Sequence, residues 1–141
     1  MKNLVGTMLA SLLLALALGP TAQAQQAQRI MKVNIPFDFS VDGKTFPSGK
    51  YRVVSVEPAV LQLRDADDRS LALVLTNAVE SANGPGAPKL YFNSESGQYV
   101  LTEVWQQNDS IGQQLPLSKS LVRTAKRDSK HRITIAAVRS H

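Results

Sequence analysis

Met31–Val41, with the sequence MKVNIPFDFSV, decides the fold class of this chain. Apolar side chains stand at every second position of this stretch, and polar side chains separate most of them. Alternation with a period of two is typical of a β-strand with one face in the core and one in water. Phe37, in the middle of the apolar row, is therefore expected to be buried. Pro36 has no N–H to donate to a neighbouring strand, so the strand is predicted to lie at a sheet edge or to be bulged there.

The residues that follow predict further short strands separated by turns. Asp42-Gly43 and Pro47-Ser48-Gly49 are turn signals. Strands are expected at 51–56, 60–64, 71–76, 90–92, 99–105 and 131–138. Strands of this length and spacing predict an all-β fold, namely a small antiparallel β-barrel or sandwich of about eight strands.

One short C-terminal helix is predicted over Ser118–Lys130, with Ser118 as its N-cap. Leu117, Leu121 and Ala125 fall on one stripe of this helix. The opposite stripe, called the basic stripe below, consists of Lys119, Arg123, Lys126, Arg127 and Lys130. One interpretation is that the helix docks its leucines on the sheet and leaves its basic residues in water. The other is that the basic stripe binds lipid headgroups or an acidic polymer, and so an anionic surface of the cell envelope.

Residues 1–24 have the pattern of an export signal. Met1-Lys2 is a basic start, residues 4–18 are almost wholly apolar, and Ala22-Gln23-Ala24 supplies the small residues that a signal peptidase recognises. We expect cleavage after Ala24, which leaves 25–141 as a single domain in the periplasm or secreted. The apolar run is short for a membrane span, so no transmembrane segment is expected after cleavage.

Composition narrows the class of protein. The chain has no cysteine, so an exported domain must be held together by packing, without disulfides and without a thiolate metal site. Residues 25–118 carry eight Lys and Arg against ten Asp and Glu, whereas 119–141 carry seven against one. The positive charge is therefore concentrated at the C-terminal end. That end has no aromatic residue among its basic ones, so nucleic acid is not expected as a partner.

The residues that could carry catalysis or bind a cofactor form no recognisable set. His131 and His141 are too few and too far apart for a zinc site. Asp65, Asp67 and Asp68 form an acidic turn, but the glycine and the distal glutamate of a calcium loop are missing. Neither a nucleophile elbow nor a glycine-rich phosphate loop is present. We therefore predict no catalytic residue, no metal and no cofactor.

Glu103 and Trp105 raise the one question that bears on function. In a regular strand both share a face with Leu101. If that face is inside, Glu103 is buried and needs a partner. If it is outside, Trp105 is exposed and can contact a ligand, so Trp105 joins the basic stripe as a candidate binding surface.

Three functions remain open from the sequence. The leading hypothesis is a non-enzymatic exported domain that serves as a binding or structural module of the cell envelope. The first alternative is a small periplasmic hydrolase that uses carboxylates such as Glu57, Glu95 and Glu103, which would require two acids facing each other across a cleft. The second is a lipocalin-like carrier of a small apolar ligand, which would require an open barrel mouth.

Ile35–Val53, with the sequence IPFDFSVDGKTFPSGKYRV, resembles the opening signature of a family of small exported bacterial proteins of unknown function that are abundant in acidobacteria. That signature combines a Val/Ile-Pro-Phe-x-Phe strand, a Gly-Lys turn and a Pro-Ala/Ser-Gly-x-Tyr segment. Tyr99–Trp105 and Gly112–Lys119 are similar to later parts of the family, whereas Asn93–Ser96 and Leu121-Val122 depart from it. The resemblance implies a signal peptide and a compact β domain, and it implies no active site.

The export signal yields a prediction about processing. N-terminal sequencing of the exported protein is expected to begin at Gln25, because Ala22 and Ala24 occupy the positions that the peptidase recognises. Retention of Met1 in the mature protein would contradict both the localisation and the domain limits.

Overall fold

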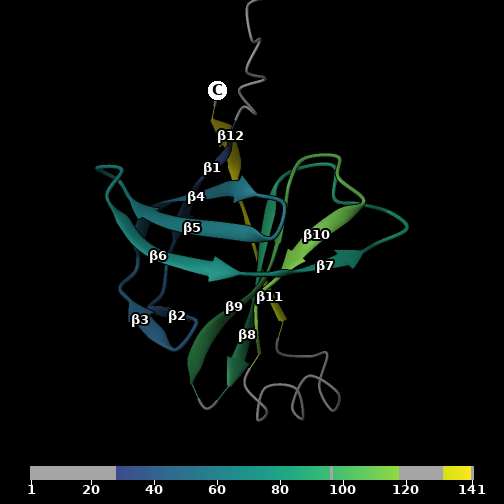
Figure 1. The fold of residues 1–141 in the computed structure, drawn as a ribbon. Coiled ribbons are helices and arrows are strands. Elements are labelled where there is room, and N and C mark those ends of the chain that lie inside the picture. Colours follow the sequence, from purple (N-terminus) through teal and green to yellow (C-terminus); the bar gives the residue numbers. More distant parts are fainter. Residues whose placement is uncertain (1–27, 96, 118–131, 141) are drawn as a thin grey trace, which may run out of the picture.

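The computed structural model describes residues 28–95, 97–117 and 132–140. These residues form twelve β-strands in two sheets and contain no helix, which confirms the predicted all-β class (Figure 1). The predicted helix Ser118–Lys130, together with the whole basic stripe, lies outside the described residues. No helix among the described residues is long and apolar enough to cross a membrane.

Sheet A is antiparallel and contains five strands. In spatial order they are β12 (Val138–Ser140), β1 (Arg29–Ile35), β4 (Gly49–Glu57), β5 (Val60–Asp65) and β6 (Ser70–Leu75). Sheet B is mixed. Its main path runs through β11 (Arg132–Ala136), β8 (Lys89–Glu95), β9 (Gln98–Trp105), β10 (Ile111–Gln114) and β7 (Asn77–Glu80). In addition, β2 (Phe39–Val41) pairs parallel with β9 and antiparallel with β3 (Lys44–Phe46).

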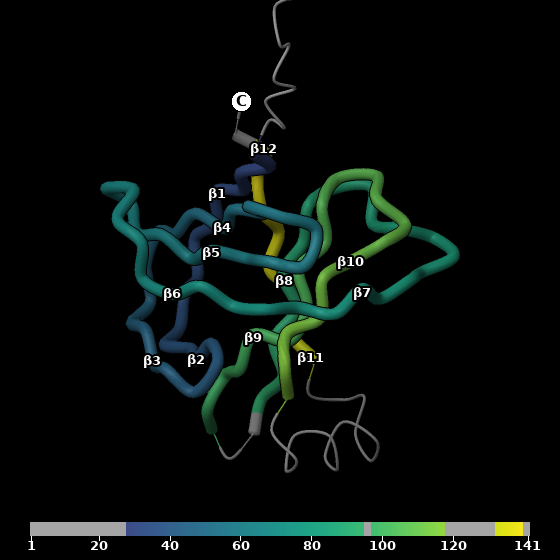
Figure 2. Tube along the Cα trace, in the orientation of Figure 1, coloured from purple at the N-terminus to yellow at the C-terminus, as the bar shows by residue number. Residues whose placement is uncertain are grey.

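The chain passes directly from one sheet to the other at four corners. β1 leads through 36–38 into β2, and β3 leads through 47–48 into β4. β6 leads through Thr76 into β7, and β11 leads through Ala137 into β12. Figure 2 shows β6 and β7 as one continuous path. The freed N–H of Thr76 donates to the carbonyl of Ala59 (2.8 Å), and that of Ala137 donates to Pro88 (3.0 Å).

These corners explain two differences from the predicted barrel or sandwich of about eight strands. The strand count is higher because the chain changes sheets within or directly after the stretches predicted at 31–41, 71–76 and 131–138. In addition, β3 and β10 form where no strand was predicted. A closed barrel is not formed, because sheet A and sheet B are joined by chain corners rather than by a ladder of hydrogen bonds. Strands that switch sheets at a bend are a known way to build the corners between two packed sheets.

The predicted single strand over Met31–Val41 is the first of these corrections. β1 ends at Ile35, and the chain turns at 36–38 before β2 begins at Phe39 in the other sheet. β1 is paired on both sides, with β12 and with β4, so it is not an edge strand. Pro36 instead follows its last residue, where the missing N–H costs no ladder hydrogen bond.

Because the predicted strand is divided into β1 and β2, Phe37 lies between them and is not fully buried. Phe39 is 1% exposed, whereas Phe37 is only partly buried and packs against the edge of the core. The Phe37 ring lies 4.1 Å from the Tyr99 ring and 5.2 Å from the Phe92 ring, measured between centroids. The prediction that Phe37 is buried was therefore only partly right.

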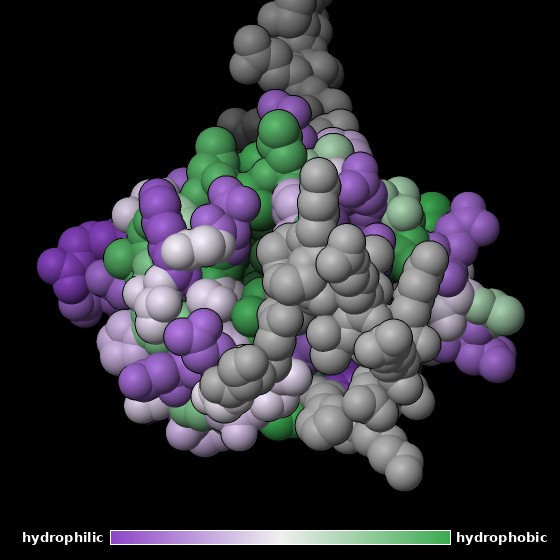
Figure 3. All heavy atoms as spheres, turned by 90° about the horizontal axis from the view of Figure 1, so that it is seen from below, coloured by the Kyte–Doolittle hydropathy of each residue, from purple (hydrophilic) through white to green (hydrophobic). Residues whose placement is uncertain are grey.

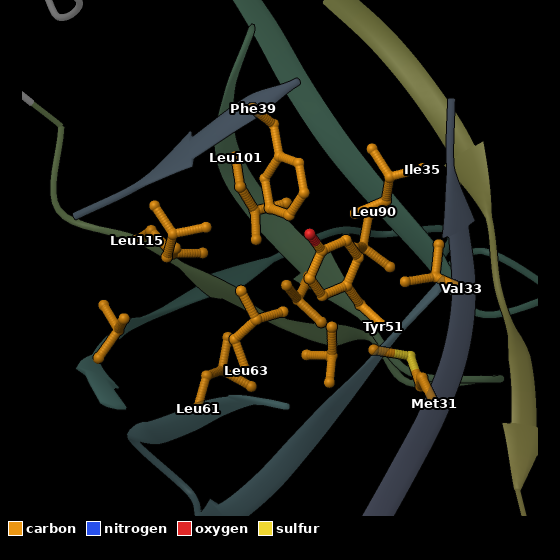
Figure 4. Close-up of a cluster of buried hydrophobic side chains, with 14 of the residues drawn as sticks. Met31, Val33, Ile35, Phe39, Tyr51, Leu61, Leu63, Leu90, Leu101 and Leu115 are labelled. Atoms are coloured by element: carbon orange, nitrogen blue, oxygen red, sulfur yellow. The ribbon is translucent and has the colours of Figure 1, made fainter. Parts of the chain in front are cut away.

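The core lies between the two sheets and is made by both. Figure 4 shows side chains from sheet A and sheet B pointing toward one another. The largest fully buried side chains are Phe39, Phe92, Met31, Ile35, Leu90, Val41, Val54 and Val104. Phe39 stands at the centre of an aromatic group, with edge-to-face contacts to Tyr51 (5.1 Å) and Phe92 (5.8 Å). Such pairs add to the free energy gained by burying apolar area.

The two predicted turns are confirmed. The second turn also holds the Tyr51 side chain in place through a hydrogen bond. Asp42 and Gly43 adopt positive φ angles of 48° and 77° in the hairpin between β2 and β3. After the second turn, the Tyr51 hydroxyl donates to the carbonyl of Pro47 at 2.5 Å. Burial raises the pKa of Tyr51, and the nearby Asp38 and Asp65 raise it further, so the phenol stays a donor at neutral pH.

The position of Phe39 gives a testable expectation about stability. Phe39→Ala is expected to lower the free energy of unfolding by about 3–5 kcal/mol, because it leaves a cavity where both sheets meet. Phe37→Ala is expected to cost less, since its ring is only partly buried. Urea denaturation measures both, with Asn34→Ala on the exposed face of β1 as the control at under about 0.5 kcal/mol. Equal costs for the two phenylalanines would contradict this account of the corner.

Candidate functional site

Strand β9 contains a bulge that decides where Glu103 and Trp105 point. Tyr91 pairs with Glu103 and Phe92 pairs with Leu101, so Thr102 is an extra residue in the ladder. A bulge shifts the alternation of side chains by one position. Leu101 therefore belongs to the core, and the prediction that it shares a face with Glu103 was wrong.

Hydrogen bonds hold the bulge in place. The Thr102 hydroxyl donates to the carbonyl of Tyr91 (3.0 Å), and the Thr102 carbonyl accepts from the N–H of Leu115 (2.9 Å). The hydroxyl and the carbonyl of this buried residue are thus satisfied. The bulge leaves Glu103 and Trp105 on the face of sheet B that points away from the core.

A first pocket, called the tryptophan pocket, lies on that outer face and has a volume of about 360 Å³. It is lined by Val79, Glu80, Ser81, Asn83, Pro85, Lys89, Tyr91, Glu103, Trp105 and Arg132. One oxygen of Glu103 accepts from the Trp105 indole N–H (2.9 Å) and from the Arg132 guanidinium (2.5 Å). That guanidinium also lies 3.8 Å above the centre of the Tyr91 ring. These contacts join the outer faces of β8, β9 and β11.

Trp105 is covered although it lies outside the core, with only 4% of its surface exposed. A Cβ on Gly112 would lie 2.5 Å from the indole, so the absence of a side chain lets the ring lie flat on β10. Of the two alternatives, the outer face is the one that the structure shows, but Trp105 is not exposed there, because its indole forms the wall of a pocket. Trp105 is thus not an exposed contact residue.

Two loops lie side by side next to this indole. The loop 81–88 contacts the loop 106–110 through hydrogen bonds from Ser81 N to Ser110 O (2.9 Å) and from Asn108 N to Pro85 O (3.2 Å) (Figure 2). A Cβ on Gly84 would lie 2.1 Å from the carbonyl oxygen of Asp109, so the two backbones are in direct contact. The close approach requires glycine at this position.

A second and larger pocket, called the inter-sheet pocket, opens where sheet A and sheet B meet, with a volume of about 610 Å³. Its lining residues come from both sheets and from the loop 106–110. They are Arg29, Ser55, Glu57, Pro58, Val104, Gln106, Asp109, Ser110, Ile111 and Gln113. Val104, which is 1% exposed, belongs to the core, so the pocket reaches the end of the apolar interior.

A chain of neutral hydrogen bonds crosses the inter-sheet pocket. The Gln106 amide donates to the Ser55 hydroxyl (3.1 Å), and that hydroxyl donates to the Gln113 amide oxygen (2.9 Å). The Gln113 amide nitrogen in turn donates to the carbonyl of Pro58 (3.0 Å). Gln106 is 9% exposed, so the chain begins in the protein interior and ends at the surface. These residues could not be identified from the sequence, because isolated glutamines and serines form no recognisable motif.

Carboxylates occur in both pockets, but each pocket holds one that is already paired. Arg132 binds Glu103 in the tryptophan pocket, and Arg29 binds Asp109 at the rim of the inter-sheet pocket. The other two carboxylates are those of Glu80 and Glu57. A glycosidase needs a protonated acid opposite a second carboxylate. Glu103 and Asp109 are instead each held in an ion pair with an arginine, which is not the arrangement of a glycosidase.

The acidic turn of Asp65, Asp67 and Asp68 is neutralised within the structure. The Asp65 carboxylate accepts from the backbone N–H of Arg69 (2.9 Å), and this contact lowers its pKa most strongly. Asp68 binds Arg52 (3.0 Å) and Arg64 (3.3 Å), and Arg52 makes the larger contribution to its lowered pKa. Among the described residues no group of three or more acids or histidines could hold a metal ion.

Comparisons with known proteins add no assignment. Neither a protein-family model, nor a curated protein, nor a solved structure matches this chain. The resemblance to the exported acidobacterial family therefore stays a prediction.

The contact between Gly112 and Trp105 yields a testable expectation. Gly112→Ala is expected to lower the free energy of unfolding by about 1–3 kcal/mol, because the new methyl group overlaps the indole. Trp105 is the sole tryptophan, so its fluorescence should shift to longer wavelength as the ring moves toward water. Gly86→Ala is the control, because a Cβ there meets nothing within 4 Å. Unchanged fluorescence in Gly112→Ala would contradict the packing described.

Proposed function

We propose that this protein is an exported, non-catalytic binding domain of the cell envelope whose inter-sheet pocket takes a small, uncharged polar molecule. The observation that carries the proposal is the chain of hydrogen bonds from Gln106 through Ser55 to Gln113, which lines a pocket of about 610 Å³. Ligand pockets commonly combine an apolar surface with a few convergent polar groups.

The lining of the pocket favours an uncharged ligand. Amides and hydroxyls both donate and accept, so they can exchange their mutual hydrogen bonds for bonds to a ligand hydroxyl or amide. The charges of Arg29 and Asp109 at the rim already neutralise each other, and the other carboxylate of the lining, Glu57, is exposed to water. A charged ligand would have to separate that pair, which is a cost that a neutral ligand avoids. Val104 and Ile111 offer apolar surface to the carbon skeleton of such a ligand.

The filling of the core bears on the two alternatives. Side chains from both sheets occupy the space that a lipocalin-like carrier would reserve for its ligand (Figure 4). This favours a site at the end of the core over a chamber inside it. The ion pairs of Glu103 and Asp109 with arginine favour binding over acid–base hydrolysis. Export rests on the N-terminal sequence, and the anionic-surface hypothesis rests on the basic stripe, both of which lie outside the described residues.

Thermal unfolding tests the proposal with three chemical classes of probe. The uncharged polar class consists of mono- and disaccharides, N-acetylglucosamine among them; sulfate represents anions and an n-alkanol represents apolar ligands. A compound of the first class is expected to raise the Tm of the mature protein, because a ligand at 100 times its Kd stabilises the folded state by about 2.7 kcal/mol. The other two classes are expected to leave the Tm unchanged.

Matched variants connect that effect to the pocket. Gln113→Met keeps a side chain of similar length but removes the amide oxygen that accepts a hydrogen bond from the Ser55 hydroxyl. The rise in Tm should therefore be lost. Gln98→Met makes the same change at an exposed position of β9 outside the pocket and should respond like the wild type. The proposal fails if no uncharged compound raises the Tm, or if Gln113→Met responds as strongly as Gln98→Met.

A further inference from the structure

Strand β6 leaves one side of sheet A open. It pairs with β5 along one side, and the described residues place no strand along the other. The backbone N–H and C=O groups on the open side can therefore pair with another strand. On the outer face of β6, Leu73 is 64% exposed and Leu75 is 72% exposed. Figure 3 shows, from below, that apolar residues of this molecule reach the surface between hydrophilic ones.

β6 differs from every other edge strand of the described residues in having no charged residue. The edge strand β12 carries Arg139, β3 carries Lys44, β7 carries Glu80 and β11 carries Arg132. β6, with the sequence SLALVL, has six residues and contains neither a charge nor a proline, whereas each of the others is shorter. Charges, prolines and bulges are the usual devices that keep an edge strand from pairing with another molecule. β6 has only a bulge at Leu71 near its start, so Ala72–Leu75 is the part of this edge that is suited to pairing.

We propose that β6 pairs antiparallel with β6 of a second copy of this chain, so that the two sheets A become one continuous sheet. A two-fold axis brings each residue near the middle of the strand close to its own counterpart. A charge there would be repelled by itself, and β6 together with Thr76–Val79 contains none. This uncharged stretch is what favours a second copy over a charged foreign peptide as the occupant.

The leucines restrict the register of this pairing. Residues directly opposite each other in an antiparallel pair lie on the same face of the sheet. A register that places Leu73 opposite Leu73 or Leu75 of the second copy joins both outer rows into one apolar surface. A shift by one residue would set these leucines opposite Ala72 and Val74, whose side chains are buried in the core.

The opposite edge of sheet A explains why association stops at two copies. β12 has three residues, and its Arg139 pairs with Met31 next to Lys32 of β1. Positive charge at this short edge opposes the addition of another sheet. The interface is therefore isologous and closes as a dimer rather than a fibre.

Analytical ultracentrifugation of the mature protein tests the dimer. The wild type is expected to change from monomer to dimer as its concentration rises. Leu73→Lys introduces self-repulsion at the axis and should sediment as a monomer over the same range. Val138→Lys is the matched control, because Val138 is 70% exposed on the opposite edge of the same sheet, and this variant should dimerise like the wild type. Circular dichroism establishes that both variants are folded.

Hydrogen exchange separates pairing by backbone from mere contact between leucines. In the dimer, amides on the open side of β6 should exchange more slowly at high concentration than in Leu73→Lys. The proposal is overturned if the wild type is monomeric at every concentration, if Val138→Lys disrupts the dimer as strongly as Leu73→Lys, or if the amides of β6 exchange at the same rate in monomer and dimer. None of these outcomes bears on the inter-sheet pocket, which β6 does not line.

Discussion

One core has to serve two sheets, and the rest of the structure follows from this requirement. Phe39 lies where the sheets meet and packs edge-to-face against Tyr51 of sheet A and Phe92 of sheet B. The chain delivers Phe39 to this position by leaving sheet A at Pro36 and entering sheet B three residues later. The corners at Thr76 and Ala137 make the same transfer at other places, and each gives its freed N–H to a carbonyl of a nearby loop.

The two pockets lie on opposite sides of sheet B. Polar residues from β4 and β10 face each other across the inter-sheet pocket, where sheet A and sheet B meet. Ser55 and Gln113 are 58 residues apart in the chain and yet are joined by a hydrogen bond of 2.9 Å. The tryptophan pocket arises on the other side of sheet B, where Gly112 allows Trp105 to lie against β10. Each pocket therefore depends on how the backbone brings distant strands together.

The sequence was informative wherever structure is set by neighbours along the chain. Alternation located the strands around Tyr51, Leu61 and Tyr99, and Asp42-Gly43 specified a turn that requires positive φ angles. It was uninformative wherever a distant segment decides. The bulge at Thr102 is fixed by hydrogen bonds to Tyr91 and Leu115, so local periodicity wrongly placed Leu101 on the same face as Glu103. The corner at 36–38 could not be predicted for the same reason. The alternation from Met31 to Val41 is unbroken, so it cannot show that its two halves belong to different sheets.

The pairing of the first strand with the last affects how the chain can fold. β1 needs β12 as a neighbour, and β8 needs β11, so neither sheet is complete until the C-terminal residues have been synthesised. Contacts of such large sequence separation slow folding, because a long loop must close before they form. Neither sheet can therefore gain all its strands before residues 132–140 are available for pairing. Late completion of the sheets agrees with the export that residues 1–24 predict, because a secretion channel passes chains that are not yet folded.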